Sequence, residues 1–301
     1  MKKRSVPALA LALATALTLS YAAIGTGSAA AALPGKAEVR QGVTVYANSK
    51  GSVDASNLSE GYLFLRYTGG KSVRIKAQIA KEGGVTYTYD LNSAGQSETF
   101  PLTEGDGNYT VKILENTTGN RYAQAYACTV NLKLRSPMAP FLYSNQFVSY
   151  GADSAVTAKA AQLTAGTEST LGKVKAVFDF VVDHFTYDNA RAAAVQSGYL
   201  PDVDQVLAQQ KGICFDYAAV MTAMLRSQGI PCKLVVGYAG TTYHAWISAY
   251  SEETGWMDGI IYFDGLNWTM MDPTYTSGGK RSQAILDYVT NPSNYQQKYA
   301  Y

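Results

Sequence analysis

Cys214 precedes a strongly apolar run in the stretch Lys211–Gly229, KGICFDYAAVMTAMLRSQG. The run is hydrophobic on nearly every side of a helix, which predicts a helix buried inside a domain and ending near Gly229. Gly212 permits a sharp turn into the helix, and Asp216 places a negative charge in its first turn, where the helix dipole favours one. A thiolate is favoured at the same end, so Cys214 is a candidate nucleophile. A cysteine that merely fills core space is the alternative.

His244 begins the run His-Ala-Trp in the predicted strand Tyr243–Tyr250 and shares one face with Trp246 and Ser248. Because the predicted sheet directly follows the cysteine helix, we expect this face to look onto the start of that helix. A histidine there could withdraw the thiol proton and later protonate a leaving amine. A structural histidine is the alternative, and it is the role that we expect for His184 on another helix.

A third group must hold the imidazole in the correct tautomer. Asp272 ends the predicted strand Trp268–Asp272, which we expect beside the strand of His244. Asp258 and Asp264 are rivals, but they fall in a predicted loop and at a predicted hairpin tip, where solvated carboxylates are common. The predicted catalytic residues are therefore Cys214, His244 and Asp272.

The second half of the chain predicts helices followed by strands. Helices are expected at 153–163, 170–185 and 203–209, and strands at 232–238 and 243–250. A hairpin is expected from strands 259–263 and 266–271, joined by Asp264–Gly265, a pair that favours a type I′ turn. This order predicts an α+β core in which the cysteine helix packs on an antiparallel sheet.

The first half alternates apolar and polar residues with a period of two, which is typical of antiparallel strands with one buried face. About seven strands are expected, near 43–47, 61–67, 73–79, 85–91, 97–102, 109–113 and 130–134. Their spacing predicts a β-sandwich. We place a β-sandwich-like accessory domain at 41–136 and a catalytic domain at 141–301, because prolines interrupt the chain between them. The many tyrosines of the first half fit β packing, with carbohydrate binding as the alternative.

The N-terminus has the three-part layout of a secretory signal peptide. Three basic residues (Lys2, Lys3 and Arg4) precede an apolar run to about residue 23 and a small-residue patch, which predicts a signal peptide at 1–32. An uncleaved anchor is the alternative. We expect a secreted or cell-surface protein with no membrane span once the leader is removed. Beyond residue 32 the chain has 22 Lys and Arg against 23 Asp and Glu, so no nucleic-acid partner is suggested.

Three cysteines, Cys128, Cys214 and Cys232, are too few for a disulfide scaffold in an exported chain of 301 residues. We expect Cys128 and Cys232 to be buried thiols, with a disulfide between them as the alternative. No cluster of His, Cys and Asp has ligand spacing. Neither a metal nor a cofactor is therefore expected.

Four motifs in order resemble the bacterial transglutaminase-like superfamily: Lys-Gly-Ile-Cys-x-Asp-Tyr-Ala, Gly-Ile-Pro-Cys-Lys-x-x-x-Gly-Tyr, His-Ala-Trp and Trp-x-x-x-Asp-Pro-Thr. The resemblance extends from about residue 153 to 275. It implies a papain-like core in which Cys214 is the nucleophile, His244 the general base and Asp272 the orienting group. Cys232, where the family often has a small residue, and the long segment between the last two motifs depart from the pattern.

The resemblance implies acyl transfer from protein or peptide amides, with cell-wall peptides among the candidates, through a thioester on Cys214. Hydrolysis, as in a cysteine peptidase or amidase, is our first hypothesis. Cross-linking of the protein-glutamine gamma-glutamyltransferase type is the second. A noncatalytic surface-binding protein with a relic core is the third. The Cys214 main-chain N–H is a candidate oxyanion donor, and Gln209, Gln210 and Tyr187 are candidates for the second donor. The substrate and the oligomeric state are left open.

Overall fold

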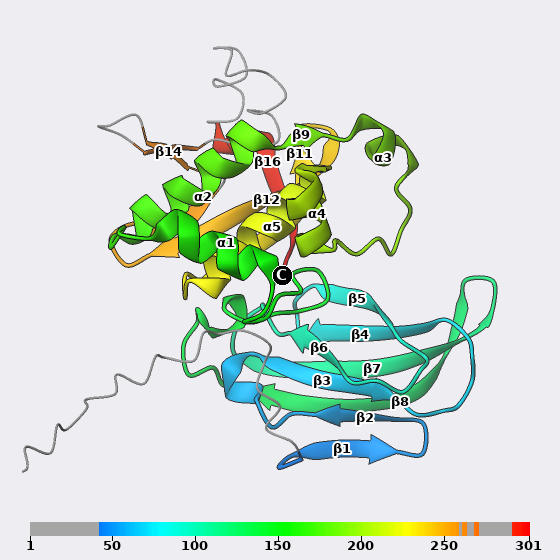
Figure 1. Ribbon diagram of the computed structural model, residues 1–301. Helices are drawn as coiled ribbons and strands as arrows, with labels where there is room; N and C mark the ends of the chain where they lie inside the picture. The colour runs from blue at the N-terminus through cyan, green and yellow to red at the C-terminus, as the bar shows by residue number, and fades with distance from the viewer. Residues whose placement is uncertain (1–41, 259–260, 264–267, 271–290) are drawn as a thin grey trace, which may run out of the picture. The chain divides into compact units, whose positions relative to one another are not determined.

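The computed structural model describes residues 42–258, 261–263, 268–270 and 291–301. The predicted signal peptide at 1–32, the turn Asp264–Gly265 and the proposed triad member Asp272 lie outside the described residues. The described residues all belong to one compact unit. The predicted α+β class is confirmed, since antiparallel strands occupy the first half and helices followed by further strands occupy the second (Figure 1).

Eight strands in the first half form two antiparallel four-stranded sheets, as expected of a sandwich. One sheet has the order β1-β2-β3-β6 and the other has the order β5-β4-β7-β8. The strands are β1 (Val45–Asn48), β2 (Gly51–Asp54), β3 (Tyr62–Tyr67), β4 (Ile75–Lys81), β5 (Thr86–Leu91), β6 (Glu98–Pro101), β7 (Gly107–Thr118) and β8 (Arg121–Leu132). A short 3₁₀ helix (Leu58–Glu60) precedes β3. The sequence analysis missed β2, which has only four residues.

The period-two pattern buries one face of each central strand. In β4, Ile75, Ala77 and Ile79 are at most 2 % exposed, whereas the residues between them are only partly buried. Across the ladder Ala77 faces Tyr89 and Ile79 faces Tyr87, so tyrosine rings fill much of this core, as cross-strand aromatic pairs do. Tyr87 and Tyr89 therefore pack in the core of the sheet, which is the role predicted for the tyrosines of the first half.

Four of the five helices that follow lie close to their predicted positions, whereas the helix at Asn189–Ala194 was not predicted. After a 3₁₀ turn at Ala139–Phe141 come α1 (Ala155–Thr164), α2 (Thr170–His184), α3 (Asn189–Ala194), α4 (Val203–Gln209) and α5 (Cys214–Ser227). The side chain of Ser169 caps α2 by accepting a hydrogen bond from the Gly172 N–H. His184 ends α2 with its ring Nδ1 2.9 Å from the Phe180 carbonyl oxygen, which fits the structural role expected of it.

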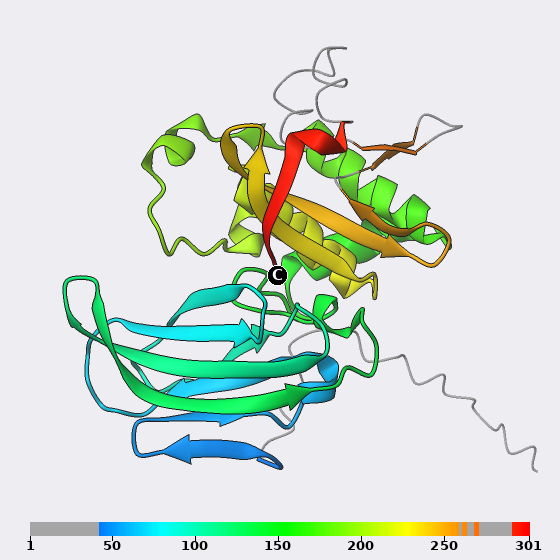
Figure 2. The same ribbon diagram turned by 180° about the vertical axis from the view of Figure 1, so that it is seen from behind.

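The second half of the chain has its own four-stranded antiparallel sheet, which we call the second sheet. It lies against α5 and has the order β13-β12-β11-β16. Its strands are β11 (Cys232–Ala239), β12 (Thr242–Ser251), β13 (Gly255–Asp258) and β16 (Tyr295–Ala300). Figure 2 shows β16, drawn in red, beside β11. The predicted strands near 232–238 and 243–250 are present, but β13 and β16 were not expected. A 3₁₀ turn (Pro292–Asn294) precedes β16.

Two further short strands, β14 (Ile261–Phe263) and β15 (Trp268–Met270), pair with each other with Phe263 opposite Trp268. The paired strands of the predicted hairpin are therefore present, but the predicted two-residue turn would place Phe263 opposite Leu266. Strands β14 and β15 form a separate two-stranded sheet. Within the described residues the sheet neighbours of β12 are β11 and β13, so, contrary to expectation, strand 268–270 does not lie next to the strand of His244.

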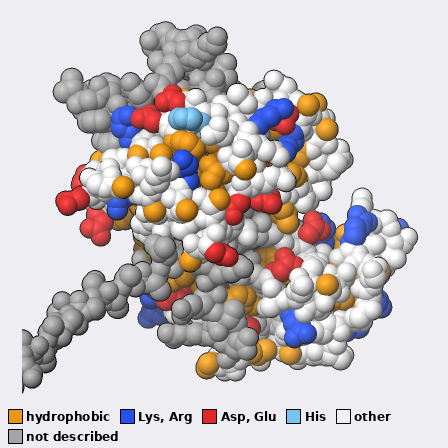
Figure 3. All heavy atoms as spheres, viewed as in Figure 1, with side chains coloured by type: hydrophobic (Ala, Val, Ile, Leu, Met, Phe, Trp, Pro, Cys, Tyr) orange, Lys and Arg blue, Asp and Glu red, His pale blue; other side chains and the backbone are white. Residues whose placement is uncertain are grey.

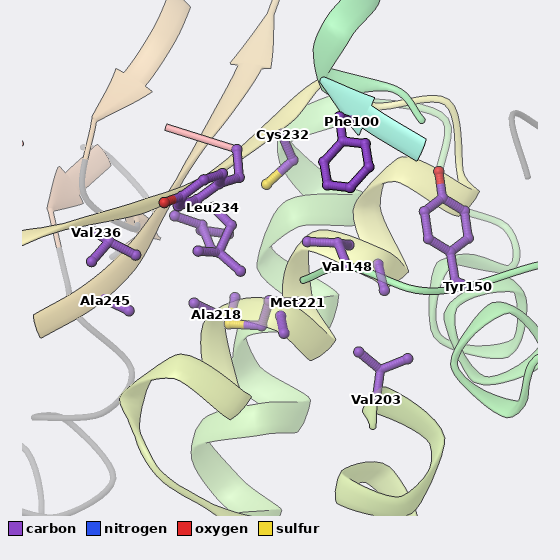
Figure 4. Packing of buried hydrophobic residues seen from close by; sticks show 14 of the residues in the cluster. Phe100, Val148, Tyr150, Val203, Ala218, Met221, Cys232, Leu234, Val236 and Ala245 are labelled. Atoms are coloured by element: carbon purple, nitrogen blue, oxygen red, sulfur yellow. The ribbon is translucent and has the colours of Figure 1, made fainter. Parts of the chain in front are cut away.

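One hydrophobic cluster includes residues of the sandwich, the helices and the second sheet. Figure 4 shows part of it, where Ala218 and Met221 of α5 pack beneath Leu234, Val236 and Ala245. Phe100 of β6 and the chain between the two halves contribute to the same cluster, the latter through Val148 and Tyr150. The division into domains at 41–136 and 141–301 remains a prediction.

The fully buried Arg226 of α5 connects these parts. Its guanidinium donates hydrogen bonds to three main-chain oxygens, at 2.8 Å to Cys232 and 2.6 Å to Tyr143 and to Tyr301. Burial lowers the pKa of this guanidinium. Each bond from a cation to a buried carbonyl is of the stronger kind, so Arg226 fixes the end of α5 to β11, to the C-terminal residues and to the connecting segment.

Acidic and basic side chains are interspersed on the face shown in Figure 3. Among the described residues, no helix is both long enough and apolar enough to cross a membrane.

Candidate active site

Cys214 is the first residue of α5, as predicted, and its side chain is partly exposed. Every residue of α5 from Asp216 to Ser227 is buried, and the helix contacts α1, α2, α4, β11 and β12. The preceding residue, Ile213, is extended, with φ −97° and ψ 176°. The chain therefore turns abruptly from an extended segment into a core helix at Cys214, which lies at the helix end where main-chain N–H groups have no intrahelical partner.

Asp216 is fully buried and holds this turn together. One of its carboxylate oxygens accepts hydrogen bonds from the Ile213 N–H at 2.9 Å and from Arg191 at 3.1 Å. The other accepts one from the Tyr199 hydroxyl at 2.6 Å. A carboxylate at the third helical position suits the dipole, as predicted, and here it also anchors the segment that contains α3.

Gly212 is required for space and not for an unusual backbone conformation. It is absent from the residues with positive φ, but a Cβ on it would lie 2.6 Å from the Cβ of Asp216. The sequence analysis assigned Gly212 to the turn for its conformational freedom. The structure shows instead that Gly212 permits the close approach of the Asp216 side chain.

A short parallel pair places a tyrosine beside the cysteine turn. Strand β9 (Thr186–Tyr187) pairs with β10 (Lys211–Gly212) in the register Tyr187↔Gly212. The Asp188 N–H donates a 2.8 Å hydrogen bond to the Gly212 carbonyl oxygen, which is a further main-chain bond between these two segments. The end of α2 is thereby connected to the residues just before Cys214.

His244 lies on β12, directly opposite Gly237 of β11, and is 5 % exposed. A Cβ on Gly237 would lie 2.0 Å from the Gln296 carbonyl oxygen of β16 and 2.9 Å from the Trp246 ring. Gly237, the glycine of the Gly-Tyr motif, therefore permits β16 to pack closely against β11 at the residue opposite His244. The His244 and Trp246 rings stack with centroids 6.2 Å apart.

Alternate residues of β12 pack in the core with α5. The residues of β12 that share the hydrophobic cluster with α5 are Ala245, Ile247 and Ala249, which alternate with His244, Trp246 and Ser248. His244 therefore belongs to the other set of side chains, and the expectation that this set looks onto the start of α5 stays a prediction.

Cys214 and His244 line the same cavity, which has a volume of about 510 Å³. Seven aromatic rings form much of its wall: Tyr89, Phe147, Tyr187, Tyr199, Phe215, Tyr243 and Tyr301. Burial, followed by the neighbouring ionisable groups of Tyr299, Tyr238 and Cys214, raises the pKa of Tyr243. Burial also raises the pKa of Tyr301, so both phenols stay protonated at neutral pH and can act as hydrogen-bond donors. Of the oxyanion candidates, Tyr187 is in this wall, whereas Gln209 and Gln210 are not among its lining residues.

Asp258 does not fit the role of orienting His244. It accepts a hydrogen bond from the Ser248 hydroxyl at 2.8 Å, and Ser248 is its cross-strand partner. Because Ser248 is four residues beyond His244 on an extended strand, Asp258 lies roughly 13 Å further along the sheet. Asp272 and Asp264 both lie outside the described residues, so the assignment of Asp272 remains a prediction.

The other two cysteines have environments that suppress thiolate formation. Burial raises the pKa of Cys232 to about 12 and also raises that of Cys128. All three cysteines are free thiols, as expected, although Cys128 is only partly buried. Within the residues that the structure describes, no three His, Cys, Asp or Glu side chains are gathered as metal ligands.

Several residues around the cavity were not predicted from the sequence. Arg191 and Tyr199 hold Asp216 by hydrogen bonds, and Tyr301 directly follows β16. Thr88 and Asp90 of the sandwich strand β5 also line the cavity. No local motif marks these residues, because each depends on contacts between segments far apart in the sequence.

Part of the chain is similar to known proteins. Residues 157–259 match the family model of the transglutaminase-like superfamily. The chain is 27 % identical over 173 residues to "Uncharacterized protein YebA" of Bacillus subtilis strain 168, covering 50 % of this chain and 22 % of that protein. It is 28 % identical over 98 residues to a protein-glutamine gamma-glutamyltransferase of Pseudomonas aeruginosa, covering 28 % of this chain and 13 % of that protein. The chain thus spans less than a quarter of the length of either relative.

Similar solved structures include a candidate cysteine protease from Cytophaga hutchinsonii, at 18 % identity and a TM-score of 0.35, covering 67 % of this chain and 72 % of that one. Red sea bream transglutaminase is 12 % identical with a TM-score of 0.30, covering 76 % of this chain and 53 % of that one. Both scores are low. The segment that carries Cys214 and His244 is the one matched by the family model, and residues 157–259 form a domain of the transglutaminase-like superfamily.

Proposed function

We propose that this protein is a thiol enzyme that transfers the acyl group of a protein or peptide amide to Cys214 and then to water. The observation that carries the proposal is the shared cavity. A partly exposed thiol at the start of a buried helix and a buried histidine line one space large enough for part of a peptide. The extent of the match to the superfamily supports this assignment.

In the first step His244 accepts the proton of the Cys214 thiol, and the sulfur attacks the carboxamide carbon. The main-chain N–H of Cys214, at the start of α5, donates to the developing oxyanion. The C–N bond then breaks, the leaving ammonia or amine takes the proton from His244, and a thioester remains. Asp272 holds the imidazole of His244 in the required tautomer.

In the second step water attacks the thioester while His244 accepts its proton. The carboxylic acid is released and Cys214 is regenerated. We favour water as the acceptor because Cys214 is partly exposed within an open cavity, and exclusion of water is what protects a reactive intermediate from hydrolysis.

Transfer to an amine is the second candidate function. The observation that favours it is the 28 % identity over 98 residues to a protein-glutamine gamma-glutamyltransferase. We further propose that the leader at 1–32 exports the protein to the cell surface or medium, where exposed proteins and cell-wall peptides would be available substrates. A noncatalytic surface-binding protein with a relic core is the alternative if the thiol proves unreactive.

One experiment separates these functions. The purified chain is incubated with a glutamine-containing protein such as casein and a biotinylated primary amine, and both ammonia release and biotin incorporation are measured. Hydrolysis predicts ammonia without biotin, and transfer predicts both in similar amounts. Cys214→Ala is the control and should abolish either signal. Neither ammonia nor other amide cleavage across a panel of proteins and peptides would contradict the proposed enzyme.

A further inference from the structure

We propose that the substrate peptide binds as an additional strand along the free edge of β5, so that its main chain leads into the cavity of Cys214. This inference rests on the proposed function and names how its substrate is held. It assigns the sandwich a direct part in recognition, through main-chain atoms at Thr88.

Strand β5 is an edge of its sheet, because the strand order is β5-β4-β7-β8. The hydrogen bonds between β4 and β7 show which main-chain groups of β5 are not used within the sheet, because β4 bonds to β7 on one side and to β5 on the other. The Arg74 carbonyl accepts from the Asn116 N–H, and the Glu82 N–H donates to the Asn108 carbonyl, so even-numbered residues beside and within β4 bond towards β7. In an antiparallel ladder consecutive residues bond to opposite sides.

The odd-numbered residues of β4 therefore bond to β5, where the register pairs Ala77 with Tyr89. By the same alternation, Thr88 and Asp90 of β5 direct their N–H and C=O groups away from β4. A side-chain bond confirms this direction, since Gln146 donates from Nε2 to the Asp90 carbonyl oxygen at 2.7 Å. The connecting segment thus occupies the edge at Asp90, and the next outward residue is Thr88.

The main-chain N–H and C=O of Thr88 have no partner in the part of the chain that the structure describes. An outward pair of this kind is what a peptide strand uses when it extends a sheet. Thr88, Tyr89 and Asp90 line the same cavity as Cys214 and His244, so a strand paired at Thr88 enters the site.

The residues around this edge fit a substrate peptide with small side chains. Gly198 lies against β5 on the opposite wall, where a Cβ would be 3.0 Å from the Asp90 carboxylate. Asp90 is also paired with Lys76 at 2.6 Å, so these two charges already compensate each other. Recognition at Thr88 therefore depends on the peptide backbone more than on a charged substrate side chain.

The test uses an acetylated tetra-alanine chloromethyl ketone, which alkylates Cys214 without turnover, and chloroacetone as a reagent that lacks the peptide. Thr88→Pro removes the outward N–H at an edge position, where proline does not break the ladder. Thr129→Pro is the matched control, because Thr129 is an exposed, outward-facing residue of β8, the opposite edge of the same sheet. Thr88→Ala retains the N–H.

We expect Thr88→Pro to lower the alkylation rate by the peptide reagent about fivefold, the value of one hydrogen bond, and to leave the chloroacetone rate unchanged. Thr129→Pro and Thr88→Ala should match the unmodified chain with both reagents. Equal peptide rates in Thr88→Pro and Thr129→Pro would overturn the proposal.

A second measurement does not depend on a folded variant. The unmodified chain is treated with peptide reagents carrying one N-methyl group at each amide in turn, and one position should lose about fivefold in rate. Equal rates across the series would overturn the strand-pairing proposal. The proposed function fails by a different result, namely a chloroacetone rate at Cys214 no higher than that of a free thiol.

Discussion

The hydroxyl of Tyr199 donates a 2.6 Å hydrogen bond to the fully buried carboxylate of Asp216, two residues after Cys214. The same carboxylate accepts from Arg191 and from the Ile213 N–H. The turn that presents the thiol is thus connected to the segment that forms one wall of the cavity. The cysteine and the wall are expected to respond together when this carboxylate is changed.

Asp216→Asn should lower both stability and thiol reactivity. The substitution removes the charge facing Arg191 in a buried site, and lost hydrogen bonds to charged groups cost about 2–3 kcal/mol. Alkylation of Cys214 by iodoacetamide should slow about tenfold, because the first turn of α5 loses its anchor. Tyr199→Phe removes one of the three bonds and should show a smaller loss of both. Unchanged labelling in Asp216→Asn would show that the network does not position Cys214.

Gly237→Ala should destabilise the second sheet. The added methyl group would lie 2.0 Å from the Gln296 carbonyl oxygen, which belongs to the main chain and cannot move alone. We expect a loss of about 3 kcal/mol in the free energy of unfolding, as for an overpacked core. Gly84→Ala is the control, because the atom nearest to its Cβ would be Lys81 Cβ at 3.2 Å. Equal unfolding midpoints in urea for the two variants would contradict the packing described around His244.

Glu115 should stabilise the sandwich in a pH-dependent way. This buried carboxylate lies 2.8 Å from Lys71 Nζ and 2.7 Å from the Tyr67 hydroxyl, and the bond from Lys71 is the main cause that lowers its pKa from 4.5. Because the pKa is lower in the folded state, its contribution is complete above pH 4.5 and is lost as pH falls through the folded value.

The difference in melting temperature between the unmodified chain and Glu115→Gln should therefore be larger at pH 7 than at pH 3. Differential scanning calorimetry at the two pH values checks this. A difference that grows on acidification would mean that burial outweighs the partners of Glu115.

Asp272→Asn should reduce amide turnover far more than Asp258→Asn. A group that orients a catalytic imidazole contributes on the order of 10³–10⁴ in rate, whereas Asp258 bonds to Ser248 four residues away from His244 along β12. Steady-state rates of ammonia release measure both variants. Similar losses in the two would remove Asp272 from the proposed triad.

The sequence was sufficient for features encoded locally. The helix of Cys214, the strand of His244 and the alternating strands of the sandwich all follow from periodicity, and α4 has its predicted bounds of 203–209. These elements have apolar patterns that match their burial, so local preference and tertiary packing agree.

Features that depend on distant contacts could not be predicted in this way. Strand β16 has a weak pattern and is fixed by pairing with β11, and β2 is too short to show a period. The contribution of β5 to the cavity depends on how the sandwich packs against residues more than a hundred positions later. The role of Gly212 was misjudged for a different reason, because the contact that requires it comes from the Asp216 side chain four residues later, and the direction of that side chain depends on its buried partners.

The most direct test of a catalytic thiol compares the three cysteines in one sample. The chain is treated with limiting iodoacetamide at pH 7, and labelling is quantified by peptide mass spectrometry in the unmodified protein and in His244→Ala. Cys128 and Cys232 serve as internal controls because burial raises the pKa of both. We predict that Cys214 is labelled at least tenfold faster than either control and that His244→Ala removes most of this advantage. Labelling of Cys214 no faster than a free thiol, and unaffected by His244→Ala, would contradict the enzyme assignment.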